Sequence, residues 1–320
     1  MRVCDELPVP AAEKFPQLTF RTFVISLERA VERRAHIHAL MKRLGIDAEI
    51  VDAVDGRRLT TQHLARYDAK AAMQVYGCDL SPNEIACFNS HLGILERMIA
   101  EGVKTALIFE DDIDCDVDIA AAAAQLCALP DGAWSLVRLE TLKPILANPR
   151  QRRAIGKRIA MIGSRRLDRV ATGVLGAGAY LVRRRAAEAI LRHSQRFFMP
   201  YDQMLDRYWE NGIAPTLLRP APARQLEAFE SVIGERGLAV QRMSLSTRLW
   251  RRWRRAADSF NKRMFWVALM APPAGRVLAA MGVKSADVAL NSPAVARLKS
   301  ETEIEADNRL ATNQARSVEN

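Results

Sequence analysis

Cysteine is scarce in this sequence, and long hydrophobic runs are missing from it. The five cysteines are odd in number and none belongs to a C-x-x-C motif, which argues against a disulfide framework and a zinc site and favours a reducing compartment. No stretch approaches the ~18–20 apolar residues of a membrane span. The N-terminus carries Asp5, Glu6 and two prolines where a secretory signal needs an apolar core. We therefore expect a cytoplasmic protein.

Acidic residues are almost missing from residues 242–276, which hold nine basic side chains and one acid. This segment contributes +8 to the net charge of +10, whereas residues 1–241 contribute +3 and residues 277–320 contribute −1. A nucleic-acid-binding protein is expected to spread its positive charge over a folded face. Charge confined to one segment indicates local docking on a surface, and we expect no nucleic-acid partner.

The sequence does contain an alternation of strand-like and helix-like segments. Strands are expected at 20–27, 46–54, 105–109, 134–139, 173–182 and 214–218, and helices at 29–44, 81–100, 119–128, 184–193 and 203–211. The alternation predicts an α/β fold with a mostly parallel sheet flanked by helices. Residues 150–169 are rich in arginine and lack periodicity, which predicts a basic, loop-rich insert.

The expected strand Thr105–Phe109 ends in three consecutive acids, Glu110, Asp111 and Asp112. An apolar run without polar alternation predicts a strand that is buried on both faces, and ligands in such sheets bind outside the carboxyl ends of the strands. Adjacent carboxylates repel one another. We favour a divalent cation, Mg²⁺ or Mn²⁺, as the reason for the cluster, because these ions take one or two carboxylates and leave positions for substrate phosphates. The alternative is an acidic loop after a strand.

Residues 244–270 combine tryptophans and other apolar side chains at three- and four-residue steps with many arginines. This pattern predicts a basic amphipathic helix that lies on an anionic membrane surface. The alternatives are a helix packed on the protein core and a helix that binds nucleic acid or protein. We expect four regions, namely an N-terminal extension (1–18), a catalytic domain (19–241), this helical segment (242–291) and a polar, disordered tail (292–320).

Four stretches of the sequence carry, in order, a resemblance to a known family. They are Phe23–Leu27 with Arg33-Arg34, Asp52–Gly56, Ser81–His91 with Ile108–Asp112, and a looser set made of Gly178–Val182, Pro200-Tyr201-Asp202 and Pro220–Gln225. These segments, within residues 20–235, resemble the glycosyltransferase family 25 enzymes of lipopolysaccharide and lipooligosaccharide biosynthesis. Those enzymes are similar in turn to the collagen galactosyltransferases.

The resemblance implies a GT-A fold and inverting transfer of a sugar, often galactose, from a UDP-sugar to a glycolipid or oligosaccharide acceptor. Mn²⁺ or Mg²⁺ would bridge the diphosphate, with Asp112 as the first-choice ligand and Glu110 bound or close by. Asp111 would lie near the ribose or sugar of the donor. Ser26 departs from the asparagine usual in the family. A glycolipid acceptor implies a peripheral location on the inner face of the cytoplasmic membrane.

Inversion needs a carboxylate that takes the proton of the acceptor hydroxyl, and Asp202 is the candidate; its alternative role is a helix N-cap. His91 either orients the acidic cluster or is a satisfied core histidine. Arg33 either pairs with a nucleotide phosphate or lies on a solvated face. Asp52 and Asp55 either approach the uridine or only shape a turn. A catalytically inactive protein that binds a nucleotide sugar, or acts as a scaffold, remains the alternative function.

Overall fold

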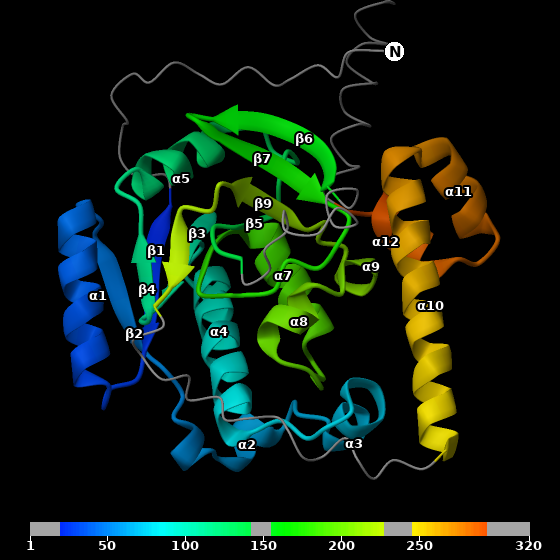
Figure 1. Ribbon diagram of the computed structural model, residues 1–320, viewed down its shortest axis with the longest axis horizontal. Helices are drawn as coiled ribbons and strands as arrows, with labels where there is room; N and C mark the ends of the chain where they lie inside the picture. Colours follow the sequence, from blue (N-terminus) through cyan, green and yellow to red (C-terminus); the bar gives the residue numbers. More distant parts are fainter. Residues whose placement is uncertain (1–19, 142–154, 227–244, 293–320) are drawn as a thin grey trace, which may run out of the picture.

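The computed structural model of the chain describes residues 20–141, 155–226 and 245–292. Within them, an eight-stranded sheet with strand order β2-β1-β3-β8-β5-β9-β7-β6 lies between two sets of helices (Figure 1). The predicted N-terminal extension and nearly all of the predicted tail lie outside the described residues.

The strands and helices have the following bounds. The strands are β1 (Arg21–Ser26), β2 (Ala48–Asp52), β3 (Thr105–Glu110), β4 (Ile113–Cys115), β5 (Leu136–Arg138), β6 (Ile155–Ile162), β7 (Arg165–Val170), β8 (Ala179–Arg183), β9 (Thr216–Arg219) and β10 (Ala223–Gln225). The longer helices are α1 (Val31–Leu44), α4 (Pro82–Ala100), α5 (Ile119–Ala128), α7 (Arg184–His193), α10 (Leu245–Met270) and α11 (Pro272–Ala280). The shorter ones are η1 (Gly56–Arg58), α2 (Thr61–Leu64), α3 (Ala69–Ala71), η2 (Ala72–Tyr76), α8 (Tyr201–Leu205), α9 (Tyr208–Asn211) and α12 (Lys284–Leu290).

The α/β class is confirmed, but the prediction of a mostly parallel sheet is wrong because the sheet is mixed. Its pairings β1–β2, β1–β3 and β5–β9 are parallel, and β3–β8, β5–β8, β6–β7 and β7–β9 are antiparallel. The physical reason lies in β8, which runs against both neighbours while helices cover both of its faces. A strand buried on both faces is apolar throughout, whatever the direction of its neighbours.

Alternate residues of the central strands point to two separate cores. On one face, Val24 of β1 and Leu107 of β3 are fully buried under α1 and α5. On the other face, Phe23 and Ile108 are fully buried under α4, α7 and α8. Both faces of the sheet are therefore covered, which leaves the strand ends as the place for a polar site.

Two of the predicted helices, α1 and α4, have capping residues at an end that lies where it was predicted. Gly45 ends α1 with a positive φ of 63°, as its position predicted. Ser81 and Glu84 form the reciprocal capping box at the start of α4, where the predicted helix 81–100 begins. The helix predicted at 203–211 is divided into α8 and α9.

The described part of the insert at 150–169 was also predicted wrongly, because it forms the hairpin β6–β7 at the edge of the sheet. The many charged residues hide its strand character in the sequence, and two of the arginines, Arg165 and Arg166, form ion pairs. Arg165 contacts both Asp116 and Asp118 at 2.8 Å, and Asp168 is fully buried beside Arg219. Asp116 and Asp118 therefore hold the hairpin to the segment that precedes α5.

The C-terminal helices form a third apolar cluster outside the main sheet. Phe265, Ala268 and Leu269 of α10 are buried against Tyr208 and Trp209 of α9, with α12 beside them. In Figure 1, α10 runs along one end of the molecule, beyond α9. In the part of the chain that the structure describes, no helix is long and apolar enough to cross a membrane.

Candidate active site

The predicted acidic residues lie at one edge of the sheet, where several strand ends meet. β1, β3 and β5 run in the same direction, since β8 between β3 and β5 is antiparallel to both. The carboxyl ends of β1, β3 and β5 and the amino end of β8 therefore converge. This convergence places Ser26, Glu110 and Glu140 in one region with the loop that holds Gly176 and Gly178.

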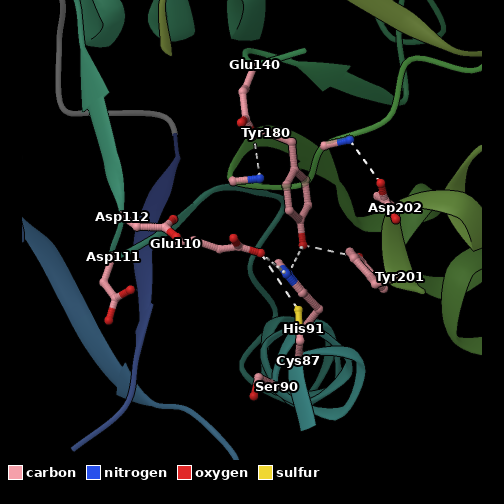
Figure 2. Close-up of polar contacts among 12 residues, drawn as sticks. Cys87, Ser90, His91, Glu110, Asp111, Asp112, Glu140, Tyr180, Tyr201 and Asp202 are labelled. Atoms are coloured by element: carbon pink, nitrogen blue, oxygen red, sulfur yellow. Dashed lines mark hydrogen bonds and ion pairs between the residues drawn. The ribbon is translucent and has the colours of Figure 1, made fainter. Parts of the chain in front are cut away.

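Asp111 faces β1 rather than the other acids. Its Oδ2 accepts a 2.6 Å hydrogen bond from the Ser26 hydroxyl, and its Oδ1 accepts a 3.3 Å bond from Arg33. Figure 2 shows its carboxylate directed away from that of Glu110. Arg33 also contacts Asp112 at 3.3 Å, so it lies against the acidic cluster and not on a solvated face.

Asp112 is buried, and its two carboxylate oxygens differ in their hydrogen bonding. Its Oδ2 accepts hydrogen bonds from Arg33 at 3.3 Å and from Gln225 of β10 at 3.2 Å. Its Oδ1 is buried and has no hydrogen-bond partner among the described residues. Burial and, second, the charge of Glu110 raise the pKa of Asp112 to about 6. A buried oxygen without a partner is costly, and a cation is the kind of ligand that would satisfy it.

Glu110, the last residue of β3, receives two side chains from α4. Its Oε1 lies 3.0 Å from His91 Nε2 and 3.8 Å from Cys87 Sγ (Figure 2). Cys87 and His91 are four residues apart, so they leave the same face of the helix. Burial, followed by the charges of Asp111 and Asp202, raises the pKa of Glu110 to about 7.

His91 is fully buried within a chain of hydrogen bonds that ends on Glu110. Burial, then the charge of Arg138, lowers its pKa to about 3, so the ring is neutral. Its Nδ1 lies 3.0 Å from the Tyr180 hydroxyl, which lies 3.2 Å from the Tyr201 hydroxyl. A consistent assignment has Nε2–H donating to Glu110, Tyr180 donating to Nδ1 and Tyr201 donating to Tyr180. His91 is thus both a satisfied core histidine and a support for Glu110.

Cys87, His91 and Glu110 could also be read as a metal site, because their ligand atoms all lie within 4.8 Å of one another. Burial raises the pKa of the Cys87 thiol well above its usual range, which disfavours the thiolate that binds metals. Both ring nitrogens of His91 are already engaged. We assign Cys87 and His91 to hydrogen bonding with Oε1 of Glu110. The carboxylates of Glu110 and Asp112 remain the candidate cation ligands.

Asp202 lies in the first turn of α8, two residues beyond the N-cap position held by Pro200. Its Oδ1 accepts a 2.8 Å hydrogen bond from the backbone of Gln203, and its Oδ2 accepts a 3.2 Å bond from the backbone of Gly176 (Figure 2). Arg138 donates to its carbonyl oxygen at 3.3 Å. The N-cap alternative is therefore wrong, and the carboxylate is oriented by the loop before β8.

Sequence reasoning missed several residues of this site. Glu140 is 3% exposed and its Oε2 accepts a 2.8 Å hydrogen bond from the backbone of Gly178. Burial, then the charge of Glu110, raises its pKa to about 7. Its signal was present, because Glu140 follows the apolar strand β5 as Glu110 ends β3. Tyr201 precedes Asp202, and Cys87 stands one helical turn before His91, but only the fold shows that these neighbours share the site.

Four carboxylates of this region, those of Glu110, Asp111, Asp112 and Asp202, raise the pKa of one or more neighbours. Arg33 lowers the pKa of Glu110 and Asp112 without cancelling the effect of burial. The raised pKa values show that the site binds protons more tightly than isolated carboxyl groups do. The buried, unpartnered Oδ1 of Asp112 and the adjacent Glu110 carboxylate are oxygen ligands of the kind that Mg²⁺ or Mn²⁺ takes, so the residues present fit such a cation.

Asp52 and Asp55 lie apart from the acidic cluster, at and just after the carboxyl end of β2. They line a pocket of about 420 Å³ together with Leu27, Arg29 and His63. Asp55 accepts a 2.8 Å hydrogen bond from Arg29 and one of 2.9 Å from the backbone of Arg57. Asp55 therefore shapes the turn, as one alternative predicted, while the pocket leaves room for a ligand.

Comparison with known proteins gives a consistent family. The family described as glycosyltransferase family 25 (LPS biosynthesis protein) matches residues 20–205. The Mus musculus protein named inactive glycosyltransferase 25 family member 3 is 39% identical over 95 residues, which are 28% of this chain and 16% of that protein. The lacto-N-neotetraose biosynthesis glycosyltransferase LgtB of Neisseria gonorrhoeae is 31% identical over 174 residues, which are 52% of this chain and 58% of that protein.

The chain thus spans only 16% to 22% of the length of the first curated relatives that it matches. A solved structure, that of a glycosyltransferase involved in the glycosylation of the major capsid of PBCV-1, is 10% identical with a TM-score of 0.30. It covers 57% of this chain and 72% of that chain, a likeness too weak to argue from. The family match, by contrast, includes β1, α4, β3 and the whole of α8, and this chain belongs to glycosyltransferase family 25.

Proposed function

We propose that this protein transfers a sugar from a UDP-sugar to a saccharide acceptor of the lipopolysaccharide or lipooligosaccharide type. Galactose is the sugar that we propose. Family membership supports the reaction class, and the description of the family as LPS biosynthesis proteins supports the acceptor class. The similarity to LgtB, a lacto-N-neotetraose biosynthesis glycosyltransferase, supports a saccharide acceptor. The GT-A assignment and the inverting course rest on the family resemblance. The observation that carries the proposal is the unpartnered Asp112 Oδ1 within a group of buried carboxylates at the carboxyl end of β3.

Asp112 and Glu110 are the residues that would hold Mn²⁺ or Mg²⁺. Asp112 offers its open oxygen, and Glu110 is supported by His91 at 3.0 Å. When bound, the cation would neutralise charge on the diphosphate leaving group. Asp111, fixed by Ser26 and Arg33, would contact the donor ribose or sugar.

Asp202 is proposed as the general base. Its carboxylate accepts hydrogen bonds from the backbone N–H groups of Gly176 and Gln203, which fix its orientation. Its role is to accept the proton of the acceptor hydroxyl while the new glycosidic bond forms and the bond to the diphosphate breaks. The pocket that contains Asp52 and Asp55 is proposed to take the uridine, with Arg33 close enough to the cluster to meet a phosphate.

The test is a turnover assay with the full chain, in which release of UDP and of glycosylated product are followed together. UDP-galactose, UDP-glucose and UDP-N-acetylglucosamine are each offered with a deacylated lipooligosaccharide, with Mn²⁺ or with EDTA. We expect product only with Mn²⁺ or Mg²⁺, and with UDP-galactose as the best donor. Turnover with no metal ion in solution would contradict the cation assignment.

An inactive, donor-binding protein is the second candidate, because relatives such as the mouse protein are named inactive. The two functions differ in one measurable respect. An inactive binder would show Mn²⁺-dependent UDP affinity without releasing UDP from any donor, whereas the proposed enzyme shows both.

A further inference from the structure

Helix α10 has two apolar faces, and only one of them is covered. The buried face consists of Phe265, Ala268 and Leu269, which pack against α9 and α12. A second row consists of Leu249, Trp253, Phe260 and Val267, whose exposed fractions are 67%, 66%, 52% and 40%. The sequence pattern predicted one apolar face, either for a membrane surface, for the protein core or for a partner, whereas the structure separates a core-packing face from an exposed one.

The exposed row is a continuous stripe. Its members are spaced by four, seven and seven residues, and at 100° per residue they fall within a sector of about 40°. From Leu249 to Val267 the stripe extends about 27 Å at 1.5 Å per residue. By the same rotation Phe265 lies about 140° away from the centre of the stripe, so the stripe faces away from the protein core.

Basic side chains accompany this stripe. Arg252 and Arg263 are exposed and lie beside it by helical rotation. Asp258, the only acid in the sequence of α10, is on the opposite side and contacts Arg207 of the core at 3.4 Å. The solvent face of α10 therefore combines apolar and positively charged groups, and its single carboxylate is held on the inner side.

We propose that this face of α10 docks on an anionic lipid surface, with the stripe inserted at the level of the headgroups and the arginines on lipid phosphates. Tryptophan and arginine on one helix suit such an interface. Pairing of two copies through the same stripe would bring Arg252 and Arg263 of both chains together, and like charges disfavour that arrangement. Charge complementarity thus favours the lipid surface over a second copy.

Docking would also orient the active site. Phe265 and Tyr208 stack edge to face with their ring centroids 5.1 Å apart, which joins α10 to α9. The next helix toward the N-terminus, α8, carries Asp202. If α10 were bound to lipid, Asp202 would be held in a fixed orientation relative to the membrane. This consequence, unlike the docking itself, rests on the proposed function.

The test is vesicle co-sedimentation of the full chain without donor or acceptor. One set of vesicles contains phosphatidylglycerol and phosphatidylcholine, and the other contains phosphatidylcholine alone. The stripe variant is Trp253→Ser with Phe260→Ser, and its control is Leu64→Ser with Val117→Ser, two exposed apolar residues elsewhere. The charge variant is Arg252→Gln with Arg263→Gln, and its control is Lys42→Gln with Arg192→Gln, which are likewise exposed.

We expect binding to the anionic vesicles alone, weakened by salt. The stripe variant should bind at least about ten-fold more weakly, and the charge variant roughly 25-fold more weakly at about five-fold per side chain, while both controls bind as the parent chain does. Equal binding to both vesicle types, or no binding to either, would overturn the proposal. So would a dimer in solution that the stripe variant abolishes, because it would assign the stripe to a second copy. The vesicle assay contains no donor or acceptor, so its outcomes test the docking proposal even if the protein transfers no sugar.

Discussion

Asp202 is the residue whose proposed role can be separated most cleanly from binding. Asn in its place keeps an oxygen that can accept the Gly176 N–H but cannot take up a proton at neutral pH. We expect Asp202→Asn to lower kcat by about 10²–10⁴-fold and to leave the donor Kd nearly unchanged, as measured by turnover and by calorimetry. Asp114→Asn, in a carboxylate paired with Arg43 outside the site, serves as the control. Loss of donor binding in Asp202→Asn would reassign this residue to the donor sugar.

The raised pKa values of Glu110 and Asp112 predict how stability depends on pH and metal. Their folded-state pKa values, about 7 and about 6, lie above the ordinary values of carboxyl groups, so the folded protein binds more protons between about pH 4 and 7. These two groups therefore destabilise the metal-free fold increasingly as pH rises through that window. A cation on the same carboxylates competes with protons and offsets the loss at high pH.

We expect Mn²⁺ to raise the melting temperature more at pH 8 than at pH 5.5. The comparison of samples with and without Mn²⁺ at each pH removes the contribution of His91, whose pKa is lowered to about 3 and which favours the fold at the higher pH. The same Mn²⁺ effect at both pH values would show that the ion binds elsewhere.

Part of the site could be predicted because its residues follow recognisable strands. Glu110, Asp111 and Asp112 end an apolar run, and their meeting at a sheet edge follows from the rule for strand ends. The different hydrogen-bond partners of these three carboxylates could not be predicted. Among them are Ser26 for Asp111 and His91 for Glu110, both distant in the sequence.

At the scale of elements, α10 offers a comparison between two phenylalanines on one helix. Phe265 is fully buried, whereas Phe260 is 52% exposed. Phe265→Ala should destabilise the protein by about 3–5 kcal/mol because it leaves a cavity beside Tyr208, and Phe260→Ala should change stability by less than about 0.5 kcal/mol. Urea denaturation measures both. Equal losses would mean that α10 packs in a different orientation.

The elements that escaped prediction share a physical cause. The hairpin β6–β7 contains many arginines, and its strand character becomes visible only when Asp116, Asp118 and Arg219 are seen to compensate Arg165 and Asp168. Helices with local caps, such as α4, were predicted because the capping residues are adjacent in sequence. Ion pairs between residues that are distant in the sequence give no local pattern from which a strand could be predicted.

At the scale of the whole molecule, the antiparallel β8 is what completes the site. It enters between β3 and β5 and brings its preceding loop to the carboxyl ends of both. Through Gly176 and Gly178 that loop contacts Asp202 and Glu140. If β8 ran parallel to its neighbours, this loop would not lie at the carboxyl ends of β3 and β5. The error in the predicted topology therefore concerned the strand that brings the loop to Asp202 and Glu140.

The most direct measurement for the central claim, that the acids after β3 hold a cation that binds the donor, is calorimetry of UDP with Mn²⁺ and with EDTA. The wild-type chain should bind UDP with Mn²⁺ and lose most of its affinity in EDTA. Asp112→Asn should bind UDP weakly and equally in both solutions while it melts no lower than the metal-free wild type, and Asp114→Asn should behave as the wild type. Wild-type affinity unchanged by EDTA, or Mn²⁺-dependent binding retained in Asp112→Asn, would contradict the account.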